Sequence, residues 1–247
     1  MPVLVITGGS TGIGAATALL GADRGYDVAI SYRTSKEQAD EVAASIRAKG
    51  RRAIAVQADA HDEAATVAFF NAVDRELGPV SALVNNAGIT GPVAKLDEVT
   101  ETMLTGVMNI NITGCFLALR EAVRRMATDR GGAGGAVVNV SSRASEIGGG
   151  GEWVHYAASK GAVDSFTIGA SRELAPRGIR VNAVNPGLID TEIHAKAGMP
   201  DRVARFIPNI PMGRAGSAEE VAKVILWLLS DEASYVTGAL IPIGGGR

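Results

Sequence analysis

The sequence contains a single cysteine, Cys115, among its 247 residues. One thiol excludes a disulfide within the chain and any metal site built from several cysteines. Histidine is also scarce, because only His61, His155 and His194 are present, and their spacing forms no metal-ligand cluster. We therefore expect no bound metal.

Excess charge and long apolar runs are lacking as well. Lys and Arg number 24 against 26 Asp and Glu, so a formal net charge of −2 gives no basic surface for a nucleic-acid partner. No run of 18 apolar residues predicts a membrane span. Residues 1–6 have no basic region and no long apolar core, so they predict a first strand and not a signal peptide. We expect a cytoplasmic protein with no membrane partner.

Short and long patterned segments alternate along the chain. Runs of β-branched residues predict strands at 3–7, 27–32, 53–57, 80–84, 136–141, 179–184 and 239–243. Segments of helical period lie at 13–24, 35–49, 62–76, 101–127, 156–175 and 218–230. With no repeat or second domain visible, we expect one α/β domain over residues 1–247. It should be a doubly wound parallel sheet of about seven strands with helices on both faces.

Glycines and polar residues follow six of the predicted strands. The segments are residues 7–14, 32–33, 59–60, 85–88, 141–142 and 185–187. The carboxyl ends of parallel strands share one edge of a sheet, and a switch in strand order opens a crevice there. These six segments together predict a binding site at that edge.

The first of these segments reads Thr-Gly-Gly-Ser-Thr-Gly-Ile-Gly from Thr7 to Gly14. Glycine permits positive φ and brings the backbone close to a pyrophosphate. The helix that begins near Ile13 directs its N-terminal N–H groups toward the phosphates. An ordinary tight turn is the alternative for this segment taken alone, but with the other motifs the pattern predicts dinucleotide binding.

Tyr156 and Lys160 lie four residues apart, which places them on the same face of a helix. A free tyrosine with a pKa near 10 is a poor base at neutral pH, and a nearby ammonium lowers that pKa. The pair is therefore a candidate general acid/base unit. A tyrosine and a lysine packed along a helix surface is the alternative.

The combination of the two motifs resembles the short-chain dehydrogenase/reductase family, and the resemblance covers the whole chain. The matching residues, in the family's order and approximate spacing, are Thr7 to Gly14, Asn85 to Gly88, Asn111, Ser142, Tyr156, Lys160 and Pro186-Gly187. The resemblance implies a Rossmann-type fold and an NAD(P)-dependent oxidoreductase. Within the family, the chain resembles bacterial members of the glucose 1-dehydrogenase and 3-oxoacyl-carrier-protein reductase kinds.

The resemblance also implies catalytic roles for four residues. Tyr156 matches the residue that exchanges a proton with the reacting oxygen, and Lys160 matches the lysine that lowers the tyrosine pKa and binds the nicotinamide ribose. Ser142 matches the serine that orients the substrate oxygen, whereas we interpret the neighbouring Ser141 as a hydroxyl bonded to its own turn. Asn111, followed by Ile-Thr-Gly, matches the asparagine that holds a water in the proton relay.

Asn109 is the fallback for this last role. The resemblance further implies a set of cofactor-binding residues: Gly8, Ser10, Thr11, Gly12, Ile13, Gly14, Tyr32, Arg33, Thr34, Asp59, Ala60, Asn86, Ala87, Gly88, Tyr156, Lys160, Pro186, Gly187, Ile189 and Thr191. Asp59 matches the residue at the adenine, although a helix N-cap before residue 62 is an alternative. Asn85 is interpreted as a structural residue that ties strands together.

Arg33 bears on which dinucleotide is bound. A carboxylate after the second strand would bind the ribose 2′-hydroxyl of NAD, whereas an arginine suits the 2′-phosphate of NADP. The chain has Tyr32-Arg33-Thr34 at this place and no carboxylate, which favours NADP(H) over NAD(H). Thr11 replaces the second basic residue of many NADP-preferring relatives, and a solvated loop arginine is the alternative for Arg33.

The predicted function is hydride transfer between a nicotinamide cofactor and a carbonyl or secondary alcohol of a small organic substrate. Residues 188–212 resemble a substrate lid, in which His194 is interpreted as solvated. A non-catalytic NAD(P)-binding regulator is the main alternative, and an epimerase or dehydratase of the related extended fold is a second. The apolar segments 112–118, 221–229 and 241–243 exceed what one sheet face needs, so with the resemblance they predict a homotetramer.

Overall fold

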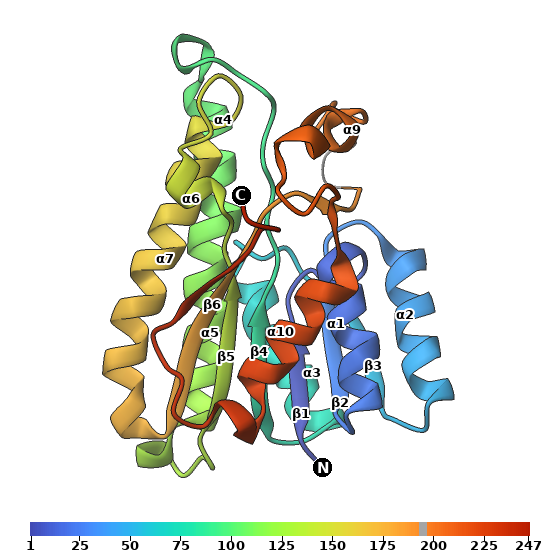
Figure 1. Ribbon diagram of the computed structural model, residues 1–247. Helices are drawn as coiled ribbons and strands as arrows, with labels where there is room; N and C mark the ends of the chain where they lie inside the picture. Colours follow the sequence, from blue (N-terminus) through green and yellow to red (C-terminus); the bar gives the residue numbers. More distant parts are fainter. Residues whose placement is uncertain (193–196) are drawn as a thin grey trace.

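Seven strands form one parallel sheet within residues 1–192 and 197–247, which the computed structural model describes (Figure 1). The strands are β1 Val3–Ile6, β2 Asp27–Tyr32, β3 Ala53–Gln57, β4 Val80–Asn85, β5 Gly135–Val140, β6 Ile179–Pro186 and β9 Leu240–Ile243. Their spatial order is β3-β2-β1-β4-β5-β6-β9. The predicted parallel sheet is therefore confirmed.

The direction of winding reverses next to β1. The chain moves outward from β1 through β2 to β3, then returns to place β4 on the other side of β1. Val5 of β1 is paired with Ala29 of β2 on one side and with Leu83 of β4 on the other. The loops that leave β1 and β4 therefore diverge and open the crevice that the strand pattern predicts.

Helices cover both faces of the sheet (Figure 1). On one face lie α1 Gly12–Asp23, α2 Lys36–Ala48 and α10 Ala218–Leu229, and on the other lie α3 Glu63–Glu76, α5 Gly114–Met126 and α7 Val154–Leu174. Successive strand residues point to opposite faces, so Leu4 and Ile6 join the first core while Val3 and Val5 join the second. A sheet buried on both faces explains why its strands are apolar throughout.

The apolar residues of α10 are part of the core. Val221, Ile225, Leu226 and Leu228 are all 1% exposed or less and pack against α1 and the sheet. The interpretation that residues 221–229 carry surplus apolar surface was wrong, because α10 has two neighbours to cover. Phe116 on α5, by contrast, is 50% exposed.

The long helix predicted at 101–127 is interrupted. It consists of α4 Glu101–Met108, a π-helical turn Asn109–Thr113 and α5. Within the turn the Gly114 N–H donates to the Asn109 carbonyl, five residues back. Such π-turns often mark functional sites, and this one contains the buried Asn111.

Short elements beyond the carboxyl ends of the strands were not predicted. They are α6 Ala144–Ile147, α9 Arg202–Phe206 and the paired strands β7 Ile189–Asp190 and β8 Gly216–Ser217. In Figure 1, α9 and α4 stand above this edge of the sheet. Residues 193–196 of the predicted lid, with His194, lie outside the described residues.

By length and composition alone, Glu101–Met126 is apolar enough to cross a membrane. Core helices of other proteins meet the same criterion. Here Ala118, Ala122 and Met126 pack into the core beside β4, while Arg120 and Arg124 carry charge on the same helix. The α5 part of this segment therefore covers the sheet.

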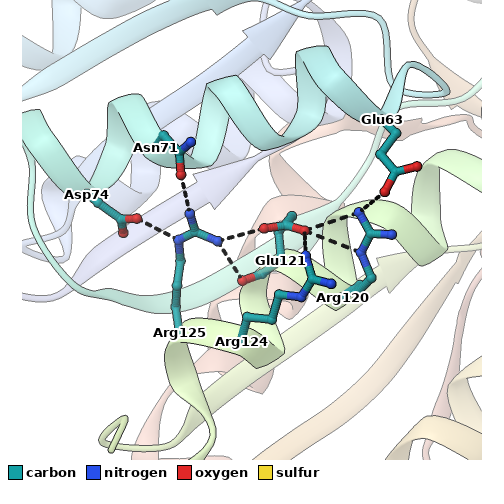
Figure 2. A network of polar contacts seen from close by, with 7 residues as sticks. All are labelled: Glu63, Asn71, Asp74, Arg120, Glu121, Arg124 and Arg125. Atoms are coloured by element: carbon teal, nitrogen blue, oxygen red, sulfur yellow. Dashed lines mark hydrogen bonds and ion pairs between the residues drawn. The ribbon is translucent and has the colours of Figure 1, made fainter. Parts of the chain in front are cut away.

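A network of ion pairs joins α3 to α5 (Figure 2). Glu121 is 3% exposed and pairs with three arginines of its own helix, Arg120, Arg124 and Arg125. Arg125 also contacts Asp74 and Asn71 of α3, and Arg120 contacts Glu63. Burial alone would raise the pKa of the Glu121 carboxyl, but the three arginines outweigh burial and lower it.

We expect Glu121→Gln to lower the free energy of unfolding by about 2–3 kcal/mol at pH 7, because three arginines lose one buried anion. Since the folded-state pKa is depressed, this stabilisation is present above the ordinary pKa of Glu and is lost as pH falls through the lower, folded value. In urea unfolding experiments from pH 7 to pH 3, the free energies of unfolding of the wild type and Glu121→Gln should converge. Glu63→Gln, an exposed member of the network, should cost less than about 1 kcal/mol. Equal unfolding midpoints for wild type and Glu121→Gln at pH 7 would show that the network is not stabilising.

Candidate active site

A cavity of about 620 Å³ opens at the carboxyl edge of the sheet. Its wall brings together segments from all six strand ends that the sequence singles out. Of the predicted site residues, those that line it are Gly8, Ser10, Thr11, Gly12, Ile13, Tyr32, Arg33, Thr34, Asp59, Ala60, Asn86, Ala87, Gly88, Ser142, Tyr156, Lys160, Pro186, Gly187, Ile189 and Thr191. Gly14 and Asn111 do not line it.

The glycine turn is shaped by backbone conformation and by close packing. Gly8 and Gly12 have φ of +64° and +55°, which side-chain-bearing residues rarely adopt. A Cβ on Gly14 would lie 2.4 Å from the Gly8 carbonyl oxygen, so Gly14 allows the turn to fold back on itself. Gly14 therefore has a packing role in the turn, and its predicted contact with a cofactor stays a prediction.

The N-terminus of α1 faces the cavity without a counter-charge of its own. Thr11 is the N-cap residue, yet its side chain caps no N–H, and the first turn contains no acidic residue. The free N–H groups and the positive end of the helix dipole suit an anion. These residues therefore fit a pyrophosphate, which is the group that the glycine turn predicts.

Two asparagines at the end of β4 form hydrogen bonds that fix neighbouring parts of the site. Asn86 Nδ2 donates to the carbonyls of Thr7 and Gly8, which fixes the glycine turn. Asn85 Nδ2 donates to Asn139 Oδ1 on β5 at 2.9 Å, as expected for a residue that ties strands together.

Arg33 and Asp59 occupy the part of the wall formed by β2 and β3. Arg33 is exposed, and within the described residues no carboxylate pairs with its guanidinium. Asp62, not Asp59, is the N-cap of α3, because its side chain accepts from the Ala65 N–H. Asp59 instead lies 2.9 Å from His61 Nδ1. The helix-cap alternative for Asp59 was therefore wrong. Because its guanidinium has no carboxylate partner among the described residues, Arg33 is available to bind an anion.

The hydroxyl groups of Ser142 and Tyr156 meet at the cavity wall. Burial raises the pKa of the Tyr156 phenol, while a hydrogen bond with the Ser142 hydroxyl and the charge of Arg202 act in the opposite direction. Ser142 Oγ also accepts from the Ala144 N–H at 3.0 Å. A phenol bonded to a hydroxyl is arranged to bind and protonate one substrate oxygen.

The Ser141 hydroxyl does not bond to its own turn, contrary to its interpretation from the sequence. Its hydroxyl donates to the Lys160 carbonyl at 3.1 Å, so it fastens α7 to β5. The bond to its own turn is made by Ser142, whose Oγ remains open to the cavity. The two serines thus have separate tasks, one structural and one at the wall.

Lys160 is buried beside Tyr156. Its Nζ donates to the Val140 carbonyl at 2.8 Å and lies 5.7 Å from the centroid of the Tyr156 ring. Burial lowers the pKa of Lys160 to about 8, against the opposing charges of Cys115 and Asp164. The expectation of a lowered Tyr156 pKa was wrong for this structure, because desolvation of the phenol is the larger effect.

Asn111 lies behind the wall and clamps the loop after β4. Its side chain exchanges two hydrogen bonds with the Ile89 backbone and donates to Ser159 Oγ, all at 2.9 Å. Ser159 Oγ in turn donates to the Tyr156 carbonyl. Asn111 thereby links the π-helical turn to the helix that carries Tyr156.

A second, small cavity of about 10 Å³ lies between Asn111 and Lys160. This volume suits about one water molecule. Asn85 Oδ1 lines the same space, is buried, and has no hydrogen-bond partner among the described residues. The space is therefore small, polar and adjacent to the lysine.

Further residues line the cavity, and three of them, Leu188, Arg202 and Phe206, belong to the predicted lid 188–212. They include Arg143, Ile147, Glu152, Trp153, Leu188, Arg202, Phe206 and Arg247. Near α7, Glu146 pairs with Arg143, and His155 is buried next to Gly91. The three arginines between residues 202 and 214 were the one sequence feature that could have indicated a charged side chain such as Arg202 at the cavity. Among the described residues, no group of three His, Cys, Asp or Glu side chains could hold a metal ion.

Comparisons with known proteins agree with this geometry. A family model described as enoyl-(acyl carrier protein) reductase matches residues 8–247. The uncharacterized oxidoreductase YgfF of Escherichia coli is 53% identical over the full length of both chains. The 3-oxoacyl-[acyl-carrier-protein] reductase FabG of Staphylococcus aureus is 37% identical, covering 98% of this chain and 96% of FabG.

Among solved structures, a short chain dehydrogenase from Burkholderia cenocepacia in complex with NADP superposes with a TM-score of 0.91. It is 35% identical, and the match covers 99% of this chain and 97% of that chain.

Proposed function

Because this chain belongs to the short-chain dehydrogenase/reductase family of oxidoreductases, we propose that it interconverts a carbonyl and a secondary alcohol of a small organic substrate with a nicotinamide cofactor. The observation that carries the proposal is that Ser142 and Tyr156 both line the 620 Å³ cavity, with Lys160 Nζ 5.7 Å from the centroid of the Tyr156 ring. A protein that only sensed the dinucleotide would not need this group of proton donors.

When bound in its reduced form, a nicotinamide cofactor would supply the hydride for the carbonyl carbon in the direction of reduction. Tyr156 gives its phenolic proton to the carbonyl oxygen, and Ser142 holds that oxygen by a hydrogen bond as charge develops on it. The raised pKa keeps Tyr156 protonated at neutral pH, which suits a proton donor. The reverse reaction requires the phenolate, and the Lys160 ammonium, 5.7 Å from the centroid of the Tyr156 ring, is a cation beside it.

The proton of Tyr156 is replaced from behind the wall. Lys160 Nζ borders both the main cavity and the small one next to Asn111. A water in the small space can accept from Lys160 and donate to the unpartnered Asn85 Oδ1. The predicted relay role of Asn111 is supported by its position at the small cavity. Its own side chain is hydrogen-bonded to Ile89 and Ser159.

NADP(H) is the proposed cofactor in preference to NAD(H). The cradle at Gly8 and Gly12 and the α1 N-terminus fit the pyrophosphate, while Asp59 and Ala60 lie where the adenine is expected. Arg33, unpaired and beside Thr34 on the wall, suits a 2′-phosphate. The relative from Burkholderia cenocepacia binds NADP. Pro186, Gly187, Ile189 and Thr191 would face the nicotinamide, and residues 188–212 would form the substrate lid.

A panel of aldehydes, ketones and alcohols, followed at 340 nm with both cofactors, tests the proposed function. We expect turnover of at least one carbonyl compound with NADPH. Tight NADPH binding without turnover of any substrate would favour a regulatory protein. We also propose a cytoplasmic location, which fractionation of a native host would test.

A homotetramer is the proposed assembly. Phe116 of α5 is 50% exposed and its ring lies 3.9 Å from that of Phe166 on α7, so the two helices present an apolar face. Leu104 of the neighbouring helix α4 is 40% exposed. Closed symmetric pairing would bury this apolar face.

Light scattering at micromolar concentration should give about 100 kDa, four times the chain mass of 25.4 kDa. Phe116→Asp should reduce the measured mass to that of a dimer or a monomer, because burying an unpaired charge in an apolar interface is strongly unfavourable. Leu96→Asp, at an exposed residue outside α4, α5 and α7, is the control and should keep the tetramer. A monomeric wild type would contradict the assembly.

A further inference from the structure

Three guanidinium groups surround the ring of Phe206 on α9. The Cζ atoms of Arg202, Arg205 and Arg247 lie 4.6, 4.9 and 4.9 Å from its centroid. We call these three residues the arginine cluster. Arg202 and Arg247 line the cavity together with Phe206, whereas Arg205 does not.

Among the described residues, Glu152 is a carboxylate that pairs with two members of this cluster. It pairs with Arg202 and, at 2.5 Å, with Arg205. One negative charge cannot neutralise two guanidinium groups, and Arg247 adds a third positive charge beside the same ring. Like charges held this close repel one another unless an anion joins them. The cavity therefore has a positive segment of wall.

Arg202 is the member of the cluster that is held most firmly. Its guanidinium is stacked between the rings of Trp153, at 4.3 Å, and Phe206, and its side chain is 14% exposed. Its Nε is buried and has no hydrogen-bond partner among the described residues. A charged donor left unpaired in a protein interior is costly, so this atom indicates a missing acceptor.

Arg202 and Tyr156 line the same cavity. The charge of Arg202 acts on the Tyr156 phenol, and Trp153 precedes Tyr156 by three residues on the same segment. An anion on Arg202 and a carbonyl at Tyr156 could therefore belong to a single small molecule. The flat, partly apolar wall of Trp153 and Phe206 would cover the carbon chain that joins them.

We propose that Arg202 binds a carboxylate of the substrate, so that the carbonyl compound reduced at Tyr156 is an oxo acid. This inference rests on the proposed function. A planar guanidinium matches a planar carboxylate, while Glu152 beside it disfavours a doubly charged phosphate. In the reaction the carbonyl carbon gains a hydride, with its two electrons, from the reduced cofactor, and the oxygen gains the Tyr156 proton. The carboxylate is unchanged, and the product is a hydroxy acid.

The test compares each oxo acid with its own methyl ester, which removes the charge and keeps the carbonyl. Acetoacetate, 4-oxopentanoate and 5-oxohexanoate, with their methyl esters, are assayed for kcat/KM with NADPH. For at least one pair the wild type should favour the acid by about tenfold or more, as one charge-assisted hydrogen bond would give.

Two variants locate the effect. Arg202→Gln should bring the ratio of acid to ester close to one, whereas Arg205→Gln, which removes a charge from the same Glu152 but lies off the cavity wall, should leave the ratio unchanged. If Arg202→Gln does not fold, Arg202→Met keeps an unbranched stem between Trp153 and Phe206 and serves instead.

The outcomes separate the two proposals. Esters and neutral ketones reduced as well as or better than the acids in every pair would overturn the carboxylate site while the oxidoreductase function stands. An acid preference that survives in Arg202→Gln, or that is lost equally in Arg205→Gln, would also overturn it. Absence of turnover with acids, esters and the wider carbonyl panel would instead count against the proposed function.

Discussion

Replacing Tyr156 with phenylalanine should lower kcat for carbonyl reduction by about 10²–10⁴-fold, which is the usual contribution of a positioned acid or base. The substitution removes only the hydroxyl that meets Ser142. The ring, which fills the cavity wall beside Lys160, remains. The fold and the dissociation constant for NADPH should therefore change little.

Steady-state assays at 340 nm and NADPH fluorescence titration measure the two quantities. Tyr26→Phe is a matched control, because Tyr26 immediately precedes β2 and does not line the cavity. It should retain wild-type turnover. Near-normal kcat in a folded Tyr156→Phe protein would transfer the proton-donor role to another residue, with Ser142 as the first candidate.

Replacing Arg33 with alanine should weaken NADPH binding by roughly 10- to 100-fold and NADH binding by less than threefold. A charge-assisted hydrogen bond contributes about 1.5–3 kcal/mol, and it is lost only when the phosphate is present. The guanidinium of Arg33 has no carboxylate partner among the described residues, so no compensating ion pair is broken.

Fluorescence titration with both cofactors gives the comparison. Arg130→Ala removes an exposed arginine that follows α5 and does not line the cavity, and it should affect neither cofactor. The difference between the two cofactors should also shrink with added salt, because an exposed charge is screened. Equal weakening of NADPH and NADH would show that Arg33 does not read the phosphate.

Local patterns were sufficient for the sheet and for most of the wall. Alternation of β-branched runs with amphipathic segments predicts βαβ units, and parallel strands bring their carboxyl ends together whatever the loops contain. The glycine turn needs positive φ at Gly8 and Gly12, which the residue type itself indicates. The contact of Tyr156 with Lys160 follows from their spacing on one helix.

Features that depend on packing could not be read in this way. Residues 109–113 keep a helical pattern, so nothing local indicates the π-helical turn that carries Asn111. The apolar face of α10 was interpreted as an interface because its two core neighbours are distant in sequence. The pKa of Tyr156 is raised because burial is a tertiary property. Arg202 reaches the wall only through its stacking on Trp153 and its pair with Glu152.

Hydride transfer itself can be followed with NADPH that carries deuterium at nicotinamide C4. The purified protein is incubated with this cofactor and the best carbonyl substrate from the panel, and the alcohol is analysed by mass spectrometry. We expect one deuterium on the carbinol carbon, transferred from one face of the nicotinamide only, and no transfer above background with Tyr156→Phe over the same time. An alcohol without deuterium, or NADPH that is bound but never consumed with any carbonyl, would contradict the assignment of this cavity as the active site of a nicotinamide-dependent oxidoreductase.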